Sequence, residues 1–204
     1  AVIRQKVPFP MSLGYVCTHV CESVCKRGHV NESTSIRELK RYAAENDTEQ
    51  LWKATSKQLP DTGKKVAVIG GGPAGLTAAL YLRKQGHDVV VKEAQPKCGG
   101  MLQYGIPAYR IPRTVIDGEV DIIKDFGVKI ETDCKVTDPV GLLKEYDAVL
   151  VAIGATVGAR LPMEGNDLEG VLTNIEFLRA AAKGEPTGMG KHVIVLGGGN
   201  VAYD

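Results

Sequence analysis

Residues 65–93 read KVAVIGGGPAGLTAALYLRKQGHDVVVKE, and this stretch carries the clearest structural signal in the chain. It begins with a short, β-branched apolar run at 66–69, which is typical of a buried parallel strand. A glycine turn and an apolar pattern of helical spacing follow, and Gly86 stands where such a helix would end. Residues 88–92 indicate a second strand. We therefore expect a strand–turn–helix–strand unit of a parallel α/β sheet.

The glycines of this unit have the G-x-G-x-x-G spacing of a dinucleotide-binding turn. Gly70 permits a tight turn, Gly72 lets the backbone approach a pyrophosphate, and Gly75 lets helix and strand pack closely. Free N–H groups at the start of the helix attract phosphate, and Glu93 can accept hydrogen bonds from a ribose. The sequence predicts an adenine-dinucleotide site; the alternative is a glycine-rich turn without a ligand.

Residues 191–204, KHVIVLGGGNVAYD, repeat this pattern. An apolar run predicts a strand, and Gly197, Gly199 and Ala202 reproduce the fingerprint with alanine in place of the third glycine. We expect a second dinucleotide site here, with a ligand-free glycine turn as the alternative. The side chain that selects NAD or NADP is expected about 20 residues beyond the turn, outside this sequence.

Three of the five cysteines lie close together, at positions 17, 21 and 25. In a continuous helix this spacing would place all three thiols on one face. Their clustering favours a metal or iron–sulfur site over disulfides, although the usual cluster spacing is C-x2-C. Buried structural cysteines are the alternative. Cys98 stands apart from the others and is expected to be incidental.

The segment between the two turns provides further candidates. Residues 94–112 form an irregular Gly- and Pro-rich loop that is expected to wrap a ligand. In it Gly100 allows close backbone approach, and Arg110 can reach a phosphate or a flavin carbonyl.

The sequence also predicts further helices and strands. The predicted helices are 35–46 (with a Ser35–Glu38 capping box), 112–126, 139–145 and 174–183. The predicted strands are 128–131 and a buried strand at 147–153.

Composition narrows the classes of function. The chain has 204 residues, is 44% hydrophobic and carries a net charge of +1, so nothing indicates a nucleic-acid partner. No apolar run approaches the ~20 residues of a membrane-spanning helix, and we expect no signal peptide. We expect a cytoplasmic protein, and a fragment, because the last residues stop inside the second turn. The expected domains are a helical iron–sulfur part (1–60), an FAD-binding Rossmann part (61–160) and the start of an NAD(P)H domain (161–204).

Together these motifs resemble a known family. The cysteine cluster, GGGPAG, GGML-x-YGIP-x-YR-x-P, YDAVLVAIGA and GGGNVAYD are similar to the small (β) subunit of NADPH-dependent glutamate synthase. They are also similar to the N-terminal region of dihydropyrimidine dehydrogenase and to NAD(P)H-ferredoxin oxidoreductase subunits. The resemblance covers essentially the whole chain, and the GGML-x-YGIP-x-YR-x-P stretch is its most specific part.

The resemblance implies a route for electrons. NADPH (or NADH) on the second turn passes hydride to FAD on the first, and single electrons leave through iron–sulfur (4Fe-4S) clusters to a larger partner. Its first implied partner is the glutamate synthase large subunit; a pyrimidine dehydrogenase, a ferredoxin oxidoreductase, or a non-catalytic nucleotide-binding module are the alternatives. No catalytic side chain is implied.

The resemblance also implies which residues bind each group. The implied FAD contacts are Gly70, Gly72, Pro73, Ala74, Gly75, Glu93, Met101, Arg110 and Val136. The implied NAD(P)H contacts are Gly197, Gly199, Asn200 and Val201, and the implied cluster ligands are Cys17, Cys21 and Cys25.

The chain also departs from the family pattern. Further cysteine ligands that the family carries upstream are missing, and many members have a cysteine where this chain has Leu13. The assignment of individual cysteines to clusters is therefore open.

Overall fold

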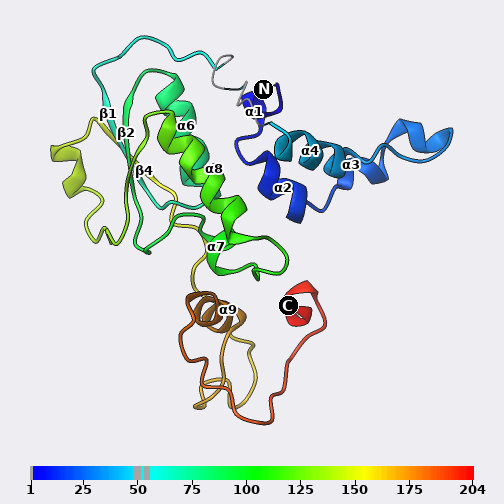
Figure 1. Cartoon of the computed structure of the whole chain (residues 1–204). Coiled ribbons are helices and arrows are strands. Elements are labelled where there is room, and N and C mark those ends of the chain that lie inside the picture. The colour runs from blue at the N-terminus through cyan, green and yellow to red at the C-terminus, as the bar shows by residue number, and fades with distance from the viewer. Residues whose placement is uncertain (1, 48–51, 53–55) are drawn as a thin grey trace.

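A computed structural model describes residues 2–47, 52 and 56–204 of the chain. A parallel sheet with covering helices forms the centre, a helical arm projects from one side, and the C-terminal segment lies beyond the sheet (Figure 1). Residues 48–51 and 53–55, in the polar sequence that follows the predicted helix at 35–46, lie outside the described residues.

The sheet has four parallel strands in the order β3-β2-β1-β4. This order is that of the first half of a Rossmann fold, and it confirms the parallel α/β prediction. Because the strand order reverses between β1 and β4, a crevice for ligands is expected at the carboxyl ends of these two strands. The strands are β1 (Lys65–Ile69), β2 (Asp88–Lys92), β3 (Lys129–Glu131) and β4 (Ala148–Val151).

Helices α6 (Pro73–Lys84) and α8 (Arg113–Asp125) pack against one face of the sheet (Figure 1). Their apolar residues recur at helical spacing, so one side of each helix is buried. Leu76, Ile116 and Ile123 are completely buried in this core, next to Val68 and Val89 of the sheet. The helix predicted to begin at Pro112 is therefore present, with Pro112 one position before its first residue.

The strand predicted at 147–153 forms, but the expectation that it is buried is wrong. Leu150 is 39% exposed, and Val151 and Ile153 are more exposed still. The reason is its place in the sheet: β4 pairs with β1 on one side, and no described residue pairs with its other side. The brief helix expected at 139–145 is a 3-10 turn, η2 (Gly141–Lys144), in which Asp138 accepts a hydrogen bond from the Gly141 N–H.

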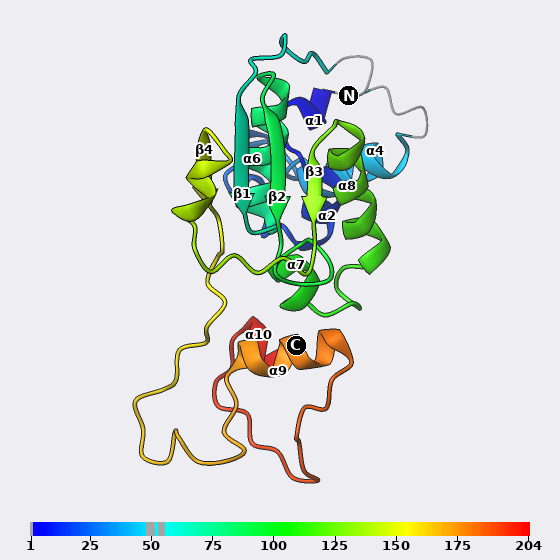
Figure 2. The same ribbon diagram turned by 90° about the vertical axis from the view of Figure 1, so that its left-hand side faces the viewer.

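The strand predicted at 191–196 is absent from the described structure. Val193 to Leu196 are exposed, Ile194 by 87%. An apolar run becomes a strand only when a neighbouring strand accepts its hydrogen bonds, and no described segment lies beside this one as a strand. The helices α9 (Asn174–Lys183) and α10 (Asn200–Tyr203) do form, below the carboxyl ends of the strands (Figure 2).

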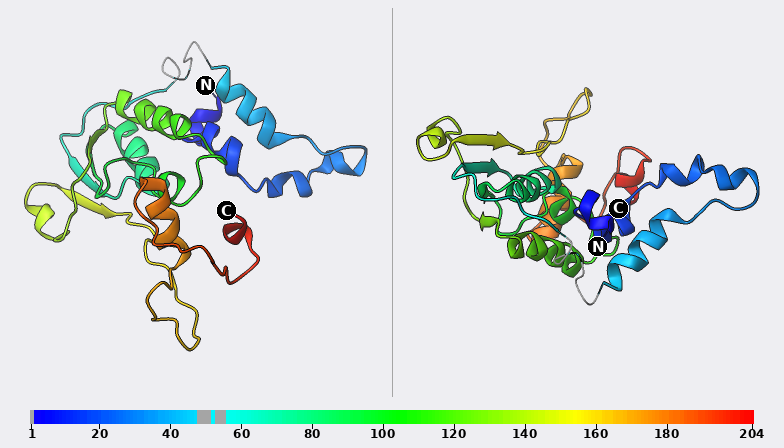
Figure 3. Two further views of the ribbon diagram at one scale, coloured as in Figure 1. Left: turned by 60° about the horizontal axis from the view of Figure 1, so that its bottom comes forward. Right: turned by 90° about the horizontal axis from the view of Figure 1, so that it is seen from above.

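The N-terminal arm consists of short helices, and it projects away from the sheet (Figure 3). The continuous helix that would align the cysteines is not formed. His19 has a left-handed backbone conformation (φ 44°), which interrupts the chain between Cys17 and Cys21. The elements are α1 (Val2–Lys6), α2 (Pro10–Val16), α3 (Val20–Ser23), η1 (Lys26–His29) and α4 (Ile36–Glu45).

The capping box predicted at Ser35 is replaced by another contact. At α4 the Ser35 side chain makes no capping hydrogen bond; the Glu22 carboxylate instead accepts the Arg37 N–H at 2.8 Å. At α9 the capping residue is Thr173, which forms a capping box with Glu176. A side chain from another segment can satisfy a helix end, and this is invisible in the local sequence.

Trp52 links the arm region to the sheet domain. Its side chain is 3% exposed, and its ring stacks on Phe126 at the end of α8 with the centroids 5.6 Å apart. Trp52 is therefore a core residue of the described structure.

The completely buried Ile123 allows a test of this core. Ile123→Ala should lower the free energy of unfolding by about 2–5 kcal/mol, because the change removes buried methyl groups and leaves a cavity. Ile194→Ala, at a position that is 87% exposed, should change it by less than about 0.5 kcal/mol. Urea unfolding followed by circular dichroism measures both. Equal losses in the two variants would contradict this packing.

Candidate dinucleotide-binding site

The first glycine turn is held by a close backbone contact at the carboxyl end of β1. Gly70 has φ +106°, a conformation that suits glycine, and its N–H donates to the Lys92 carbonyl at 2.9 Å. A Cβ on Gly75 would lie 1.9 Å from the Gly70 carbonyl oxygen. Any side chain at position 75 would therefore push α6 away from the strand that it covers.

Gly72 has a different role from Gly75. It is the cap residue of the 12-residue helix α6, in extended conformation (φ −79°, ψ 179°), and Pro73 and Ala74 begin the helix. A Cβ on Gly72 would meet only the Gly100 Cα, at 3.7 Å. The first N–H groups of α6 have no acceptor within the helix, so this open position is suited to an anion such as a pyrophosphate.

The loop after β2 packs directly on the glycine turn, and glycines on both sides let the two backbones touch. The Gly99 N–H donates to the Gly71 carbonyl at 2.7 Å, and a Cβ on Gly100 would lie 2.8 Å from the Gly72 Cα. Gly100 has φ +53° and caps α7 (Met101–Tyr104), so Met101, 41% exposed, lies at the edge of this glycine cradle.

Glu93 binds the backbone of the turn through its carboxylate. It is 8% exposed; its Oε2 accepts the Gly71 N–H at 2.6 Å and its Oε1 accepts the Gln95 N–H at 2.8 Å. The motif predicts a ribose contact for Glu93, and nothing in the local sequence indicates this second, structural role. A carboxylate offers about four acceptor positions, so two protein bonds leave capacity for a ribose hydroxyl. The residues of the turn therefore fit an adenine dinucleotide.

Cys98 fills the space beneath the turn. A Cβ on Gly71 would lie 2.4 Å from the Cys98 Sγ, and Cys98 is 5% exposed. Burial, with a smaller effect of the nearby Glu93 charge, raises the pKa of the Cys98 thiol to about 12. The thiol is thus neutral and packs under the glycines, a role that sequence analysis did not assign.

Val136 lies in the loop after β3, half-buried. This loop runs beside the end of β2, because the Cys134 N–H donates to the Glu93 carbonyl at 2.8 Å and the Asp133 N–H donates to the Gln95 carbonyl at 3.2 Å. The structure thus brings the loop that carries Val136 next to Glu93.

Arg110 forms an ion pair with Asp204, the residue that follows α10. Its Nε donates to the Asp204 carboxylate, which also accepts a bond from the Tyr109 hydroxyl. The bond to Asp204 raises the pKa of Arg110. Arg110 therefore connects the loop of the first turn to Asp204, which follows α10 at the second turn.

The second glycine turn reproduces the backbone of the first. Gly197 has φ +119°, against +106° for Gly70. Gly199 has φ −81° and ψ 174°, against −79° and 179° for Gly72. Asn200 and Val201 begin α10, as Pro73 and Ala74 begin α6. A Cβ on Gly197 or Gly199 would have no neighbour within 4 Å, so this turn has the conformation of the first without its packing.

The three N-terminal cysteines are free but are not gathered. Cys17 ends α2 and is half-buried, Cys21 is exposed on α3, and Cys25 is half-buried before η1. In the described part of the chain, no group of three or more Cys, His, Asp or Glu side chains is placed to hold a metal ion. The continuous helix that would place the three thiols on one face is therefore not formed, and the alternative of buried structural cysteines does not hold for these three residues.

Two of these sulfur atoms do accept hydrogen bonds. The His19 N–H donates to the Cys17 Sγ at 3.4 Å. Hydrogen bonds from the backbone of Thr34 and of Arg27 lower the pKa of Cys25. At Cys25 these donors favour the thiolate, which is the form that binds metals. The donor chemistry fits an iron–sulfur cluster, whereas the present separation of the thiols does not.

Two family models match the chain. Residues 64–204 match the pyridine nucleotide-disulphide oxidoreductase model, and residues 1–52 match a model described as dihydropyrimidine dehydrogenase domain II, 4Fe-4S cluster. The cofactor types expected from the sequence, a flavin and nicotinamide dinucleotide pair and a 4Fe-4S cluster, are those of the matched domains. No described helix has the length and apolar character needed to cross a membrane.

Individual relatives agree with this assignment. The NADPH-Fe(3+) oxidoreductase subunit beta of Geobacter sulfurreducens is 42% identical over 100% of this chain and 31% of its own length. Glutamate synthase [NADH] of Schizosaccharomyces pombe is 34% identical over 96% of this chain and 10% of its own length. The chain thus spans less than a third of either relative.

A solved structure shows the same fold. Mycobacterium tuberculosis FprA, in complex with NADPH, superposes with a TM-score of 0.53 at 24% identity, over 60% of this chain and 29% of that one. With the match over residues 64–204, the strand order and the glycine turn, these findings confirm the resemblance drawn from the motifs. The chain belongs to the pyridine nucleotide-disulphide oxidoreductase family.

Proposed function

We propose that this chain is the electron-input part of a flavoprotein, which takes reducing equivalents from NADPH or NADH and delivers them through iron–sulfur clusters to a larger partner. The observation that carries the proposal is the glycine cradle at the carboxyl ends of β1 and β2. There Gly72 and Gly100 face each other without side chains, at the start of a helix with free N–H groups.

In this proposal three parts of the chain divide the work. Residues 1–60 hold the cluster, 61–160 bind FAD, and 161–204 begin the NAD(P)H domain. Bound FAD accepts two electrons from a reduced nicotinamide and releases them one at a time. The chain contributes placement: Gly72 and the start of α6 receive the pyrophosphate, Glu93 receives the ribose, and Met101 and Val136 border the same crevice.

The nicotinamide dinucleotide is assigned to the second turn. Gly197 and Gly199 already have the backbone conformation of the first turn, and Asn200 and Val201 start the helix that would face the phosphates. Arg110, through Asp204, ties this turn to the loop around the first. This contact supports a role for Arg110 in joining the two dinucleotide sites.

The final electron acceptor differs among relatives. By its name one relative reduces Fe(3+), whereas another is a glutamate synthase. We therefore propose electron input as the shared function, with the glutamate synthase large subunit as one candidate partner among several. A cytoplasmic location is proposed as well, because all five cysteines are free. Free thiols are typical of proteins in a reducing compartment.

Substitution of Gly72 should remove flavin binding while leaving the fold largely intact. In Gly72→Val the backbone can keep its extended conformation, and loss of stability should stay near 1 kcal/mol, but the side chain fills the pyrophosphate position. FAD content of the purified holoprotein should fall at least about tenfold, and NADPH-driven reduction of ferricyanide should fall with it.

Two comparison variants complete this test. Gly75→Ala should lose stability and flavin together, because its Cβ overlaps the Gly70 carbonyl oxygen. Gly118→Ala, on the exposed side of α8 with no atom within 4 Å of the added Cβ, should keep both. Normal flavin content in Gly72→Val would refute the assignment of the first turn.

Thiol alkylation tests the proposed cluster ligands. In the cluster-free chain at about pH 8, Cys25 should react readily with iodoacetamide, because its hydrogen bonds favour the thiolate. Cys98, whose pKa is about 12, should react only after unfolding. Reconstitution with iron and sulfide should then protect Cys17, Cys21 and Cys25, while Cys134, outside the proposed ligand set, remains reactive. Mass spectrometry of peptides reads each position, and continued labelling of the three after reconstitution would remove them as ligands.

A further inference from the structure

Glu119 is a fully buried carboxylate in the middle of α8. Its side chain is 1% exposed, although neither glycine turn includes it. The residues around it on α8, Ile116, Val120 and Ile123, are buried in the core of the sheet domain. The backbone of Glu119 is therefore held firmly by the dinucleotide-binding part of the chain.

The carboxylate of Glu119 binds the N-terminal arm. Its Oε1 accepts the Met11 N–H at 2.8 Å, and its Oε2 accepts the Ser12 N–H at 2.9 Å. The Arg4 guanidinium lies 3.5 Å from Oε1. Met11 and Ser12 are in the first turn of α2, whose N–H groups have no acceptor in the helix, and the preceding Phe9 supplies no side-chain cap. Glu119 thus caps a helix that is more than a hundred positions away in the sequence.

This arrangement costs free energy that an apolar contact would not. Burial raises the pKa of Glu119 and lowers the pKa of Arg4, so the loss of hydration outweighs the pairing for both groups. Replacement of buried ion pairs by apolar residues is often neutral or stabilising. What a buried, hydrogen-bonded carboxylate does supply is a fixed direction and register for the group that it binds.

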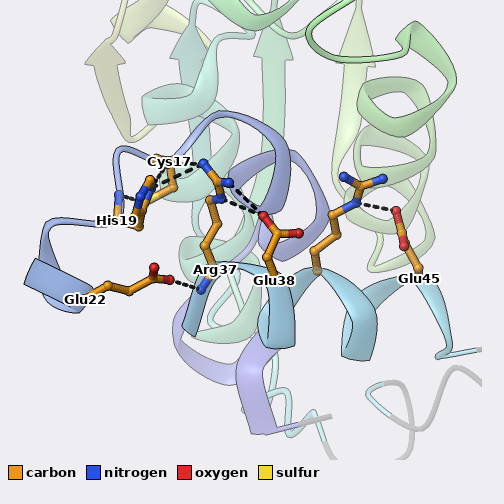
Figure 4. A network of polar contacts seen from close by, with 7 residues as sticks. Cys17, His19, Glu22, Arg37, Glu38 and Glu45 are labelled. Carbon is orange, nitrogen blue, oxygen red and sulfur yellow. Dashed lines mark hydrogen bonds and ion pairs between the residues drawn. The ribbon is translucent and has the colours of Figure 1, made fainter. Parts of the chain in front are cut away.

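Helix α2 carries this register to Cys17. The Cys17 N–H donates to the Leu13 carbonyl at 3.0 Å, so Cys17 directly continues the helix whose first turn Glu119 binds. Along its length α2 packs closely on α4, where a Cβ on Gly14 would lie 2.6 Å from the Arg41 Cβ. Beyond its end, Arg37 of α4 contacts the Cys17 carbonyl at 3.5 Å and the His19 ring at 3.2 Å (Figure 4).

We propose that Glu119 is a positioning residue that acts through α2 to fix where Cys17 lies relative to the dinucleotide-binding domain. The consequence for a cofactor rests on the proposed function: Cys17 would help to hold the cluster, and Glu119 would fix the position of that ligand relative to the first turn. Glu119 touches neither group.

The test compares Glu119→Gln with Asp121→Asn in the holoprotein. Gln keeps the shape but removes the charge, and Asp121 is a 65% exposed carboxylate on the same helix. In Glu119→Gln the amides of Met11 and Ser12 should exchange with deuterium about tenfold faster or more, as expected for lost charged hydrogen bonds. Amides of β1 and α8 should keep wild-type protection. After rapid mixing with NADPH, flavin bleaching should keep its wild-type rate while cluster bleaching slows.

Each outcome decides the proposal. Unchanged exchange at Met11 and Ser12, or equal effects in Asp121→Asn, would overturn it. Protection lost throughout β1 and α8 would also overturn it, since Glu119 would then be a general stability residue. Arg4→Gln, which leaves both N–H bonds in place, is a milder second variant and should accelerate the same amides to a smaller extent. If the wild-type protein shows no bleaching by NADPH, the proposed function fails, while the exchange result still tests the placement of α2.

Discussion

The contact between the Gly70 carbonyl oxygen and the α carbon of Gly75 sets how closely strand β1 and helix α6 approach. A Cβ at position 75 would lie 1.9 Å from that oxygen, so the two elements can meet only at glycine. This approach aims the start of α6 at the carboxyl end of the sheet and leaves Gly72 facing Gly100. The open cradle, the covering loop and the proposed flavin site all depend on this close approach of β1 and α6.

Backbone N–H groups bound by distant carboxylates organise the rest of the molecule. Glu93 holds Gly71 in the first turn, Glu119 holds the start of α2, and Glu22 holds the start of α4. Each acid satisfies donors that regular secondary structure leaves free, and each joins segments that are separate in the sequence. Figure 4 shows the bond between Glu22 and the Arg37 N–H, in the same network of polar contacts as Cys17 and His19.

Periodic patterns predicted the parts of the fold that are locally determined. β1, α6, β2 and α8 follow from apolar spacing and from the glycines that end them, and the turn at Gly70 follows from its motif. Contacts between distant segments could not be predicted in this way. Nothing near Met11 in the sequence indicates that Glu119 caps α2. Ser35 is a plausible local cap for α4, yet the Glu22 carboxylate binds the first turn of that helix instead. The helix expected across the cysteines failed at His19, and the strand expected at 191–196 lacks a partner among the described residues.

The most direct test of the account is an anaerobic visible absorption spectrum of the holoprotein before and after NADPH is added. The glycine cradle and the cysteine segment predict flavin bands together with broad iron–sulfur absorbance. NADPH should bleach the flavin bands and lower the iron–sulfur absorbance as electrons arrive. A colourless protein, or flavin bands that NADPH leaves unchanged, would contradict the central claim that this chain receives electrons from a nicotinamide dinucleotide through a flavin.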